Sequence, residues 1–317
     1  MLDLPSRANA LVVGGGTMGA DVALVLARAG CKTMVMESAG ARRTLLPDYF
    51  ARGLSDLGYT NRLGKLSACA SLDEVTWSGV DLVIECIPER LDIKQALFAE
   101  LVRRTRPDTL LTSNSSSFPI SDIAANLDSA PRMLGLHFFM PAHLVPLVEV
   151  ILGKVSDPAH AEMLATFMRG CGMVPVIVRK DLPGFLANRL QHALAREAFA
   201  MIDDGVATAE DVDNAVRFGF GFRFLAAGPV LQRDHAGLEV HTAAAATMYP
   251  SLSVATTPAR VLRDKVAAGK LGMKTGEGFF RWTQQSTAAE RKRYDDLLRA
   301  GLKLIAAELP QIRADDK

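Results

Sequence analysis

The sequence predicts an α/β fold in which an N-terminal doubly wound sheet is followed by an all-α C-terminal domain. Short apolar runs alternate with amphipathic segments through the first half of the chain, and strand signals disappear after Gly184. At 317 residues, the chain also exceeds the roughly 250 to 300 residues at which a single core stops growing. We therefore expect two domains, residues 1–181 and 182–317, with their boundary between Arg179 and Pro183.

The first domain is expected to contain a largely parallel sheet. Nearly continuous apolar runs, rather than alternating ones, are typical of strands covered on both faces. Alternation of such runs with helical segments indicates right-handed βαβ units. The expected strands are 10–13, 33–36, 82–86, 109–112, 133–139, 147–151 and 174–178, and the expected helices are 18–29, 92–104 and 159–170.

The second domain is expected to be helical. Thr208, followed three residues later by Asp211, has the spacing of an N-cap and its reciprocal acid. The apolar periodicity predicts helices at 185–204, 208–217, 236–248, 259–268 and 287–308.

Composition limits the kinds of partner. A formal charge of +1 provides no basic surface for nucleic acid or anionic membranes, so we expect a small-molecule ligand. The N-terminus lacks the features of a signal peptide, and no apolar stretch approaches the roughly 18 residues of a membrane span. Four scattered cysteines suit a reducing compartment, and we expect a cytoplasmic protein. No metal site is predicted, because no histidine or cysteine spacing suits one.

A glycine-rich segment follows the first predicted strand. Gly14, Gly16 and Gly19 form a GxGxxG pattern at the start of a predicted helix. The first glycine allows a tight turn, the second lets a pyrophosphate approach the backbone, and the third lets the helix pack closely on the strand. The N–H groups around Thr17 and Met18 are then free to bind phosphate oxygens. This context predicts a Rossmann-type dinucleotide site.

An acid ends the second predicted strand. Glu37 lies 18 residues after Gly19, at the place where a carboxylate accepts hydrogen bonds from the adenosine ribose. A carboxylate there also repels a 2′-phosphate, which favours NAD over NADP. Arg42 and Arg43 leave NADP as an alternative.

A histidine and a glutamate occur in neighbouring apolar strands. His137 ends one run, shortly before Pro141, and Glu149 lies inside the next. A buried glutamate without a partner is costly, so we expect the two side chains to pair. A carboxylate on one ring nitrogen raises the basicity of the other, which suits a general base. A structural pair is the alternative, and spacing does not separate the two.

Several longer motifs occur in a fixed order along nearly the whole chain. They are Glu-Cys-Ile-Pro-Glu-Arg-Leu-Asp-Ile-Lys at 85–94, Asn-Ser-Ser-Ser at 114–117, Gly-Leu-His-Phe-Phe-Met-Pro at 135–141, Leu-Val-Glu-Val at 147–150, Pro-Gly-Phe-Leu-Ala-Asn-Arg at 183–189 and Gly-Met-Lys-Thr-Gly-Glu-Gly-Phe at 272–279. Together they resemble the L-3-hydroxyacyl-CoA dehydrogenase family.

The resemblance implies catalytic roles for four residues. His137 takes the proton of the C3 hydroxyl as hydride leaves for the nicotinamide. Glu149 orients His137 and stabilises its protonated form. Ser116 hydrogen-bonds the substrate oxygen, and Asn188 reaches the reacting group.

The resemblance also implies binding functions. Glu89 and Lys94 are expected near the nicotinamide-side ribose, with Ser116 as a further cofactor contact. The implied reaction is reversible NAD-dependent oxidation of an L-3-hydroxyacyl-CoA to the 3-keto product, within fatty acid metabolism. A homodimer formed through the C-terminal domain is also implied.

Some residues depart from the acyl-CoA pattern. Met140 stands where the family usually has asparagine, and the segment 37–85 is short. Residues 219–229 look more like the L-gulonate 3-dehydrogenase (lambda-crystallin) and carnitine dehydrogenase branch, and Arg223 in that stretch is a candidate partner for a substrate carboxylate. A small free 3-hydroxy acid is therefore an alternative substrate. A non-catalytic, crystallin-like nucleotide-binding protein is the alternative from another class.

Overall fold

The computed structural model describes residues 2–313. The chain forms two compact units, one running to Asn188 and completed by the segment that begins at Ala306, the other spanning Arg189–Ile305.

The first unit is built on one eight-stranded sheet in the order β3-β2-β1-β4-β5-β6-β7-β8. Neighbouring strands from β3 to β6 are parallel, β7 runs antiparallel to β6, and β8 is parallel to β7. The strands are β1 Asn9–Val13, β2 Lys32–Met36, β3 Leu66–Cys69, β4 Leu82–Glu85, β5 Leu110–Ser113, β6 Met133–Phe138, β7 Leu147–Leu152 and β8 Val174–Val178.

All seven predicted strands are present, but the sequence prediction omitted β3. This edge strand has four residues, Leu66–Cys69, and its two middle residues are exposed. Because Ser67 and Ala68 are small or polar, the segment lacks the continuous apolar run by which the inner strands were recognised.

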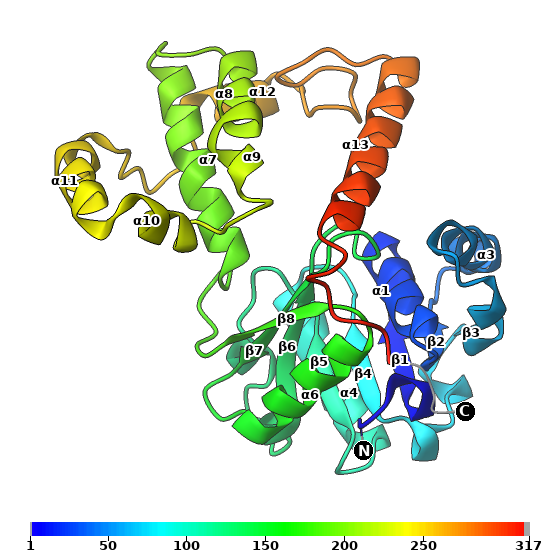
Figure 1. Cartoon of the computed structure of the whole chain (residues 1–317). Helices are drawn as coiled ribbons and strands as arrows, with labels where there is room; N and C mark the ends of the chain where they lie inside the picture. Colours follow the sequence, from blue (N-terminus) through cyan, green and yellow to red (C-terminus); the bar gives the residue numbers. More distant parts are fainter. Residues whose placement is uncertain (1, 314–317) are drawn as a thin grey trace. The chain divides into compact units, whose positions relative to one another are not determined.

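Helices cover both faces of the sheet. Residues of α1, α3 and α6 share one apolar core with one face, and residues of α4 and α5 share a second core with the other. Figure 1 shows α1 and α6 lying over the same face. The helices of this unit are α1 Thr17–Arg28, α2 Gly40–Arg43, α3 Leu46–Leu57, α4 Leu91–Arg104, α5 Ile120–Ile123 and α6 Pro158–Gly170, with 3-10 turns at Pro5–Arg7, Thr60–Lys65, Leu72–Glu74, Trp77–Gly79 and Ala130–Arg132.

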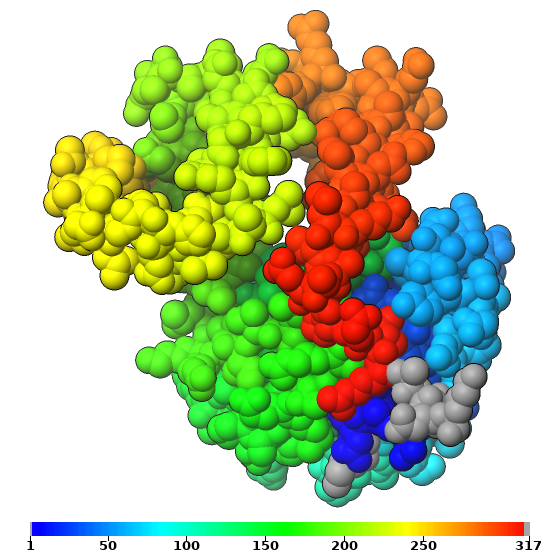
Figure 2. Space-filling model, in the orientation of Figure 1, coloured from blue at the N-terminus to red at the C-terminus, as the bar shows by residue number. Residues whose placement is uncertain are grey.

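The end of the chain returns to the first unit. Ile312 packs against the α1 and α6 core, and the Arg313 N–H donates to the Gly170 carbonyl at 3.1 Å. Figure 2 shows the C-terminal segment, in red, on the surface of that unit.

The second unit is helical, as predicted, with only isolated bridges in place of strands. Thr208 caps α8, and Asp211 completes the reciprocal hydrogen bonds of the predicted capping box. No helix within residues 2–313 combines the length and apolar character needed to cross a membrane. The helices are α7 Ala187–Asp203, α8 Ala209–Ala215, α9 Gly221–Arg223, α10 Leu231–Ala236, α11 Leu238–Met248, α12 Arg260–Ala267 and α13 Gln284–Leu304, with a π turn at Val216–Phe220 and a 3-10 turn at Tyr249–Ser251.

Candidate active site

The glycine-rich loop joins β1 to α1. Gly14 has a φ of +105°, and a Cβ there would lie 2.7 Å from the Cys86 carbonyl oxygen. A Cβ on Gly19 would lie 1.9 Å from the Gly14 oxygen, so neither position accepts a side chain without a backbone shift. Gly16, in contrast, has open space on its Cβ side within 4 Å. The loop is therefore tight where it supports α1 and open where a phosphate would approach.

The start of α1 suits an anionic group. Gly16 is its N-cap and supplies no side-chain acceptor, so the N–H groups of the first turn are left for a ligand or water. Thr17 is exposed and Met18 is half-buried against the core. These features fit the dinucleotide pyrophosphate that the sequence predicted.

Glu37 is held directly beside this loop. Its carboxylate accepts hydrogen bonds from the Gly15 N–H at 3.0 Å, the Ala39 N–H at 2.8 Å and Arg42 at 3.2 Å. Burial by itself would raise the pKa of Glu37, but the hydrogen bonds from Ala39, Arg42 and Gly15 hold it below its ordinary value. The group is therefore a fixed anion at the end of β2, where an adenosine ribose would lie.

The β6–β7 ladder pairs His137 with Glu149. The two residues lie directly opposite each other in the antiparallel register, and the distance from His137 Nδ1 to Glu149 Oε2 is 2.8 Å. Both side chains are buried, at 3% and 0% exposed. Since the carboxylate accepts from Nδ1–H, Nε2 carries the free lone pair, as a general base requires.

Glu149 also binds backbone N–H groups at the start of α7. Its Oε1 accepts hydrogen bonds from the Leu186 and Ala187 N–H groups, at 3.1 and 2.8 Å. Gly184 and Phe185 both have positive φ, which turns the chain so that these N–H groups face the carboxylate. The buried charge is thus shared between an imidazole and a helix N-terminus. Asn188 follows directly, in the first turn of α7 and at the end of the first unit.

Ser116 contacts the other side of the imidazole. Its Oγ lies 3.1 Å from His137 Nε2. The rings of Phe139 and Phe185 lie 4.6 and 5.6 Å from the imidazole, centroid to centroid, and shield it. The structure therefore brings Ser116, His137 and Glu149 into one continuous chain of hydrogen bonds, and Met140 lies beyond it with 62% of its surface exposed.

Glu89 and Lys94 lie next to the serine loop. Lys94 is only 1% exposed, and its ammonium contacts Glu85 at 2.6 Å and Glu89 at 3.2 Å. Glu89 is 37% exposed and accepts hydrogen bonds from the loop that carries Ser116. Sequence reasoning did not identify Glu85 as the main partner of Lys94. The signal was present, because Glu85 is an acid inside an apolar strand, as Glu149 is.

A second buried polar cluster was also missed. Asp21, on α1, accepts hydrogen bonds from the Tyr49 hydroxyl and from the Ala142 N–H, the latter at 3.0 Å. His143 Nδ1 lies 3.1 Å from the same carboxylate. The Asp21 carboxylate, through the Ala142 N–H, therefore connects the β6–β7 loop to α1. An acid in the middle of the apolar run of α1 was the available signal.

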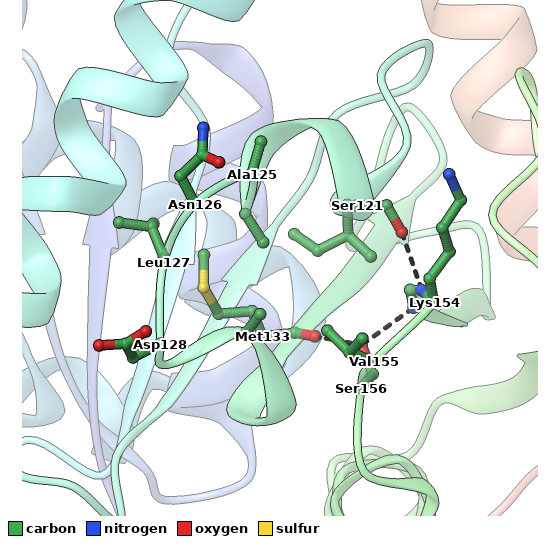
Figure 3. A pocket seen from close by; sticks show the side chains of 13 residues that line it. Ser121, Ala125, Asn126, Leu127, Asp128, Met133, Lys154, Val155 and Ser156 are labelled. Carbon is green, nitrogen blue, oxygen red and sulfur yellow. Dashed lines mark hydrogen bonds between the residues drawn. The ribbon is translucent and has the colours of Figure 1, made fainter.

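A pocket of about 360 Å³ opens at the other end of β6, away from His137. Figure 3 shows Met133, the first residue of β6, with Ser121, Lys154 and Ser156 around it. The Ser121 hydroxyl accepts from the Lys154 N–H at 2.8 Å, and the Ser156 hydroxyl donates to the Met133 carbonyl at 2.6 Å. Both hydrogen bonds join residues that line this pocket, and none of these residues belongs to the candidate site. Within residues 2–313, no cluster of three His, Cys, Asp or Glu side chains is arranged to hold a metal ion.

Family models match both halves of the chain. Residues 9–182 match the NAD-binding domain of 3-hydroxyacyl-CoA dehydrogenase, and residues 184–282 match its C-terminal domain. The predicted fold class and the predicted cofactor, NAD, are confirmed by these matches together with the sheet described above.

Relatives of two kinds are similar over most of the chain. The 5-formyl-3-hydroxy-2-methylpyridine 4-carboxylate 5-dehydrogenase of Mesorhizobium japonicum is 33% identical over 286 residues, covering 89% of this chain and 93% of the relative. A 3-hydroxybutyryl-CoA dehydrogenase of Mycobacterium tuberculosis is 36% identical over 280 residues, covering 85% and 96%.

Two solved structures are also similar over most of the chain. A crystal structure of the pyridine carboxylate 5-dehydrogenase, described as an NAD⁺-dependent dismutase, has a TM-score of 0.89 at 31% identity and covers 94% of this chain and 98% of that one. FadB2 of M. tuberculosis has a TM-score of 0.72 at 34% identity and covers 89% and 100%.

Proposed function

Because the chain belongs to the 3-hydroxyacyl-CoA dehydrogenase family, we propose that it catalyses the reversible NAD-dependent oxidation of an L-3-hydroxyacyl-CoA to the 3-keto product. The observation that carries this proposal is the hydrogen-bonded series Ser116, His137 and Glu149, which lies at the same edge of the sheet as the glycine loop. The same intact series argues against a purely structural, crystallin-like protein.

In the proposed reaction, His137 Nε2 removes the hydroxyl proton. Glu149 fixes the tautomer through Nδ1 and stabilises the imidazolium that forms. Ser116, already 3.1 Å from Nε2, is placed to hydrogen-bond the same substrate oxygen. Bound NAD supplies the hydride acceptor. We assign Asn188 to orientation of the reacting group, on the family motif at 183–189.

Cofactor contacts are proposed for residues on both sides of the loop. Gly14, Gly16, Thr17, Met18 and Gly19 would hold the pyrophosphate, with Glu37 on the adenosine ribose. We place Glu89, Lys94 and Ser116 toward the nicotinamide-side ribose. Of these, Glu89 and Ser116 have exposed surface with which to contact it.

A substrate without CoA is the second candidate. The relative with the TM-score of 0.89 acts, by its name, on a pyridine carboxylate. Arg42 and Arg43, two cations of the 37–85 segment that could meet CoA phosphates, are also partly engaged: Arg42 pairs with Glu37, and Arg43 donates to the Glu37 carbonyl. Both observations favour a free carboxylate such as a small hydroxy acid.

Steady-state kinetics separate the two substrates. Purified protein would be assayed by NADH absorbance with acetoacetyl-CoA, L-gulonate, L-carnitine and a hydroxymethyl-pyridine carboxylate. Activity on acetoacetyl-CoA with none on the free acids supports the first candidate. The reverse pattern rejects acyl-CoA as the substrate and supports the second. The His137→Gln variant serves as the control for contaminating dehydrogenases.

We also propose a homodimer formed through the helical unit. Within residues 189–305, all of which the structure describes, Gly278 is the single buried residue. A groove between α7, α8 and the segment around Phe279 is lined by apolar side chains such as Leu194, Phe199 and Val212. A helical unit with so little core needs cover from another surface. Light scattering should therefore give twice the chain mass, and a monomer would reject the proposal.

The cytoplasm is proposed as the location. The composition and the four free cysteines suit a reducing compartment.

A further inference from the structure

The Glu89 carboxylate lies inside the loop that carries Ser116. Its Oε1 accepts hydrogen bonds from the Ser115 hydroxyl at 2.6 Å and from the Ser116 and Ser117 N–H groups at 3.0 and 2.9 Å. Three consecutive residues of the loop therefore donate to one oxygen. Successive N–H groups arranged in this way form a concave anion site, which an ionised carboxylate fills.

The other oxygen of Glu89 is held from behind by a buried ion pair. Lys94 Nζ lies 3.2 Å from Glu89 Oε2, 2.6 Å from Glu85 Oε1 and 3.3 Å from the Ile87 carbonyl, which accounts for its three protons. Glu85 is fixed in turn by the Ser113 hydroxyl at 2.6 Å and the Ile87 N–H at 2.7 Å. The ends of β4 and β5 and the start of α4 thus share one satisfied polar network.

The network keeps Glu89 charged. Burial would raise the pKa of Glu89, but the Ser115 hydroxyl, the Lys94 ammonium and the Ser117 N–H lower it below its ordinary value. A neutral group at this place would leave N–H groups of the loop with weaker acceptors. The orientation of the loop therefore depends on a negative charge that lies outside the series Ser116, His137 and Glu149.

We propose that Glu89 is a positioning residue for the reaction. It holds the Ser115–Ser117 loop so that the Ser116 hydroxyl stays within reach of His137 Nε2. Lys94 acts through Glu89. This role is distinct from a contact with the cofactor ribose, and it rests on the proposed function of Ser116. Without the negative charge of Glu89, the Ser116 hydroxyl moves away from the substrate oxygen that it binds. Turnover therefore falls while substrate affinity changes little.

A double-mutant cycle tests the proposal. Glu89→Gln should lower kcat about 10- to 100-fold, the equivalent of weakening one or two charge-assisted hydrogen bonds, with KM for the substrate changed less than about threefold. In the Ser116→Ala background, the same substitution should have little further effect on kcat, because the hydroxyl it positions is gone. NADH affinity, measured by fluorescence titration in both backgrounds, reports any separate cofactor contact.

Glu74→Gln is the matched control. Glu74 also accepts hydrogen bonds from a loop N–H and a serine hydroxyl, those of Ala70 and Ser71, but in another part of the unit. Its substitution should leave kcat unchanged. Where Glu89→Gln gives little folded protein, Ser115→Ala removes one donor, keeps the charge, and should give a smaller loss of kcat that also disappears in the Ser116→Ala background.

The outcomes distinguish this proposal from the proposed function. A Ser116→Ala enzyme with full kcat would reject the role of Ser116 itself. If Ser116→Ala is slow but the losses of kcat multiply fully in the double variant, Glu89 does not act through Ser116, and the inference is overturned while the proposed function stands.

Discussion

His137 and Glu149 face each other directly across the antiparallel β6–β7 ladder, with 2.8 Å between Nδ1 and Oε2. The distance between the two side chains is set by the backbone pairing of β6 with β7 rather than by the conformation of a loop. Glu149 is further held by the Leu186 and Ala187 N–H groups. The imidazole is therefore oriented before any substrate binds, which reduces the reorganisation needed in the reaction.

Glu149→Gln tests this orientation. The amide keeps the shape of the side chain but loses the charge that stabilises a protonated imidazole, and its NH₂ group favours the wrong tautomer. We expect kcat to fall about 10²- to 10⁴-fold, with NADH affinity little changed. Stopped-flow or steady-state rates and a fluorescence titration measure the two effects. Turnover within about twofold of the wild type would show that the pair is structural.

His137→Gln removes the proposed base. Glutamine cannot accept a proton near neutral pH, so turnover should fall about 10²- to 10⁴-fold. The variant should still bind NADH, because the glycine loop and Glu37 are untouched. His160→Gln is a suitable control, since His160 is half-buried and contacts the Pro131 carbonyl rather than the site. Full activity in His137→Gln would assign the base to another group.

Two glycines of the same loop should respond differently to alanine. A Cβ at Gly19 would lie 1.9 Å from the Gly14 carbonyl oxygen, so Gly19→Ala should lower the stability of the first unit by about 1 to 3 kcal/mol or more and weaken NADH binding. A Cβ at Gly16 meets no atom within 4 Å, so Gly16→Ala should keep a nearly normal melting temperature.

Gly16→Ala should nevertheless weaken NADH binding at least about tenfold, because its methyl group occupies the space through which a pyrophosphate approaches the backbone. Thermal melts and NADH titrations of the two variants provide the comparison. Normal NADH affinity in Gly16→Ala would mean that the phosphates lie elsewhere.

The fold followed from the sequence where burial was complete. The inner strands were recognisable as apolar runs because both faces of the sheet are covered. The glycine loop identified the first strand-to-helix turn. β3 was missed because an edge strand with two exposed residues carries no such run. Which strands are neighbours, and that β7 reverses direction, depends on tertiary packing and could not be deduced from local pattern.

The candidate site followed from the sequence less completely. An acid in an apolar strand identified Glu149, and the same reasoning applied to Glu85 would have predicted a buried partner for it. The resemblance instead implied a cofactor contact for Lys94. The link between Glu89 and Ser116 joins segments 27 residues apart, and no spacing rule along the chain predicts a contact of that kind.

Glu37 should make stability depend on pH in the acid range. Its folded-state pKa is lowered, because the hydrogen bonds from Ala39, Arg42 and Gly15 outweigh the opposing effect of burial. A carboxylate with a lowered folded pKa contributes stability that is fully present above its unfolded pKa, about 4.3, and is lost as pH falls through the folded pKa. At neutral pH, Glu37→Gln should therefore lower the melting temperature by an amount equivalent to about 1 to 3 kcal/mol.

The difference in melting temperature between wild type and Glu37→Gln should be constant from pH 8 to about pH 5 and should narrow below about pH 4. Glu162→Gln, which changes an exposed acid on α6, serves as the control for general charge effects. A difference that stayed constant down to the acid unfolding of the protein would contradict the assignment, because the stabilisation would then not come from the ionised carboxylate. A difference that widened in acid would have the opposite pH dependence. It would mean that Glu37 is protonated more readily in the folded chain than in the unfolded one.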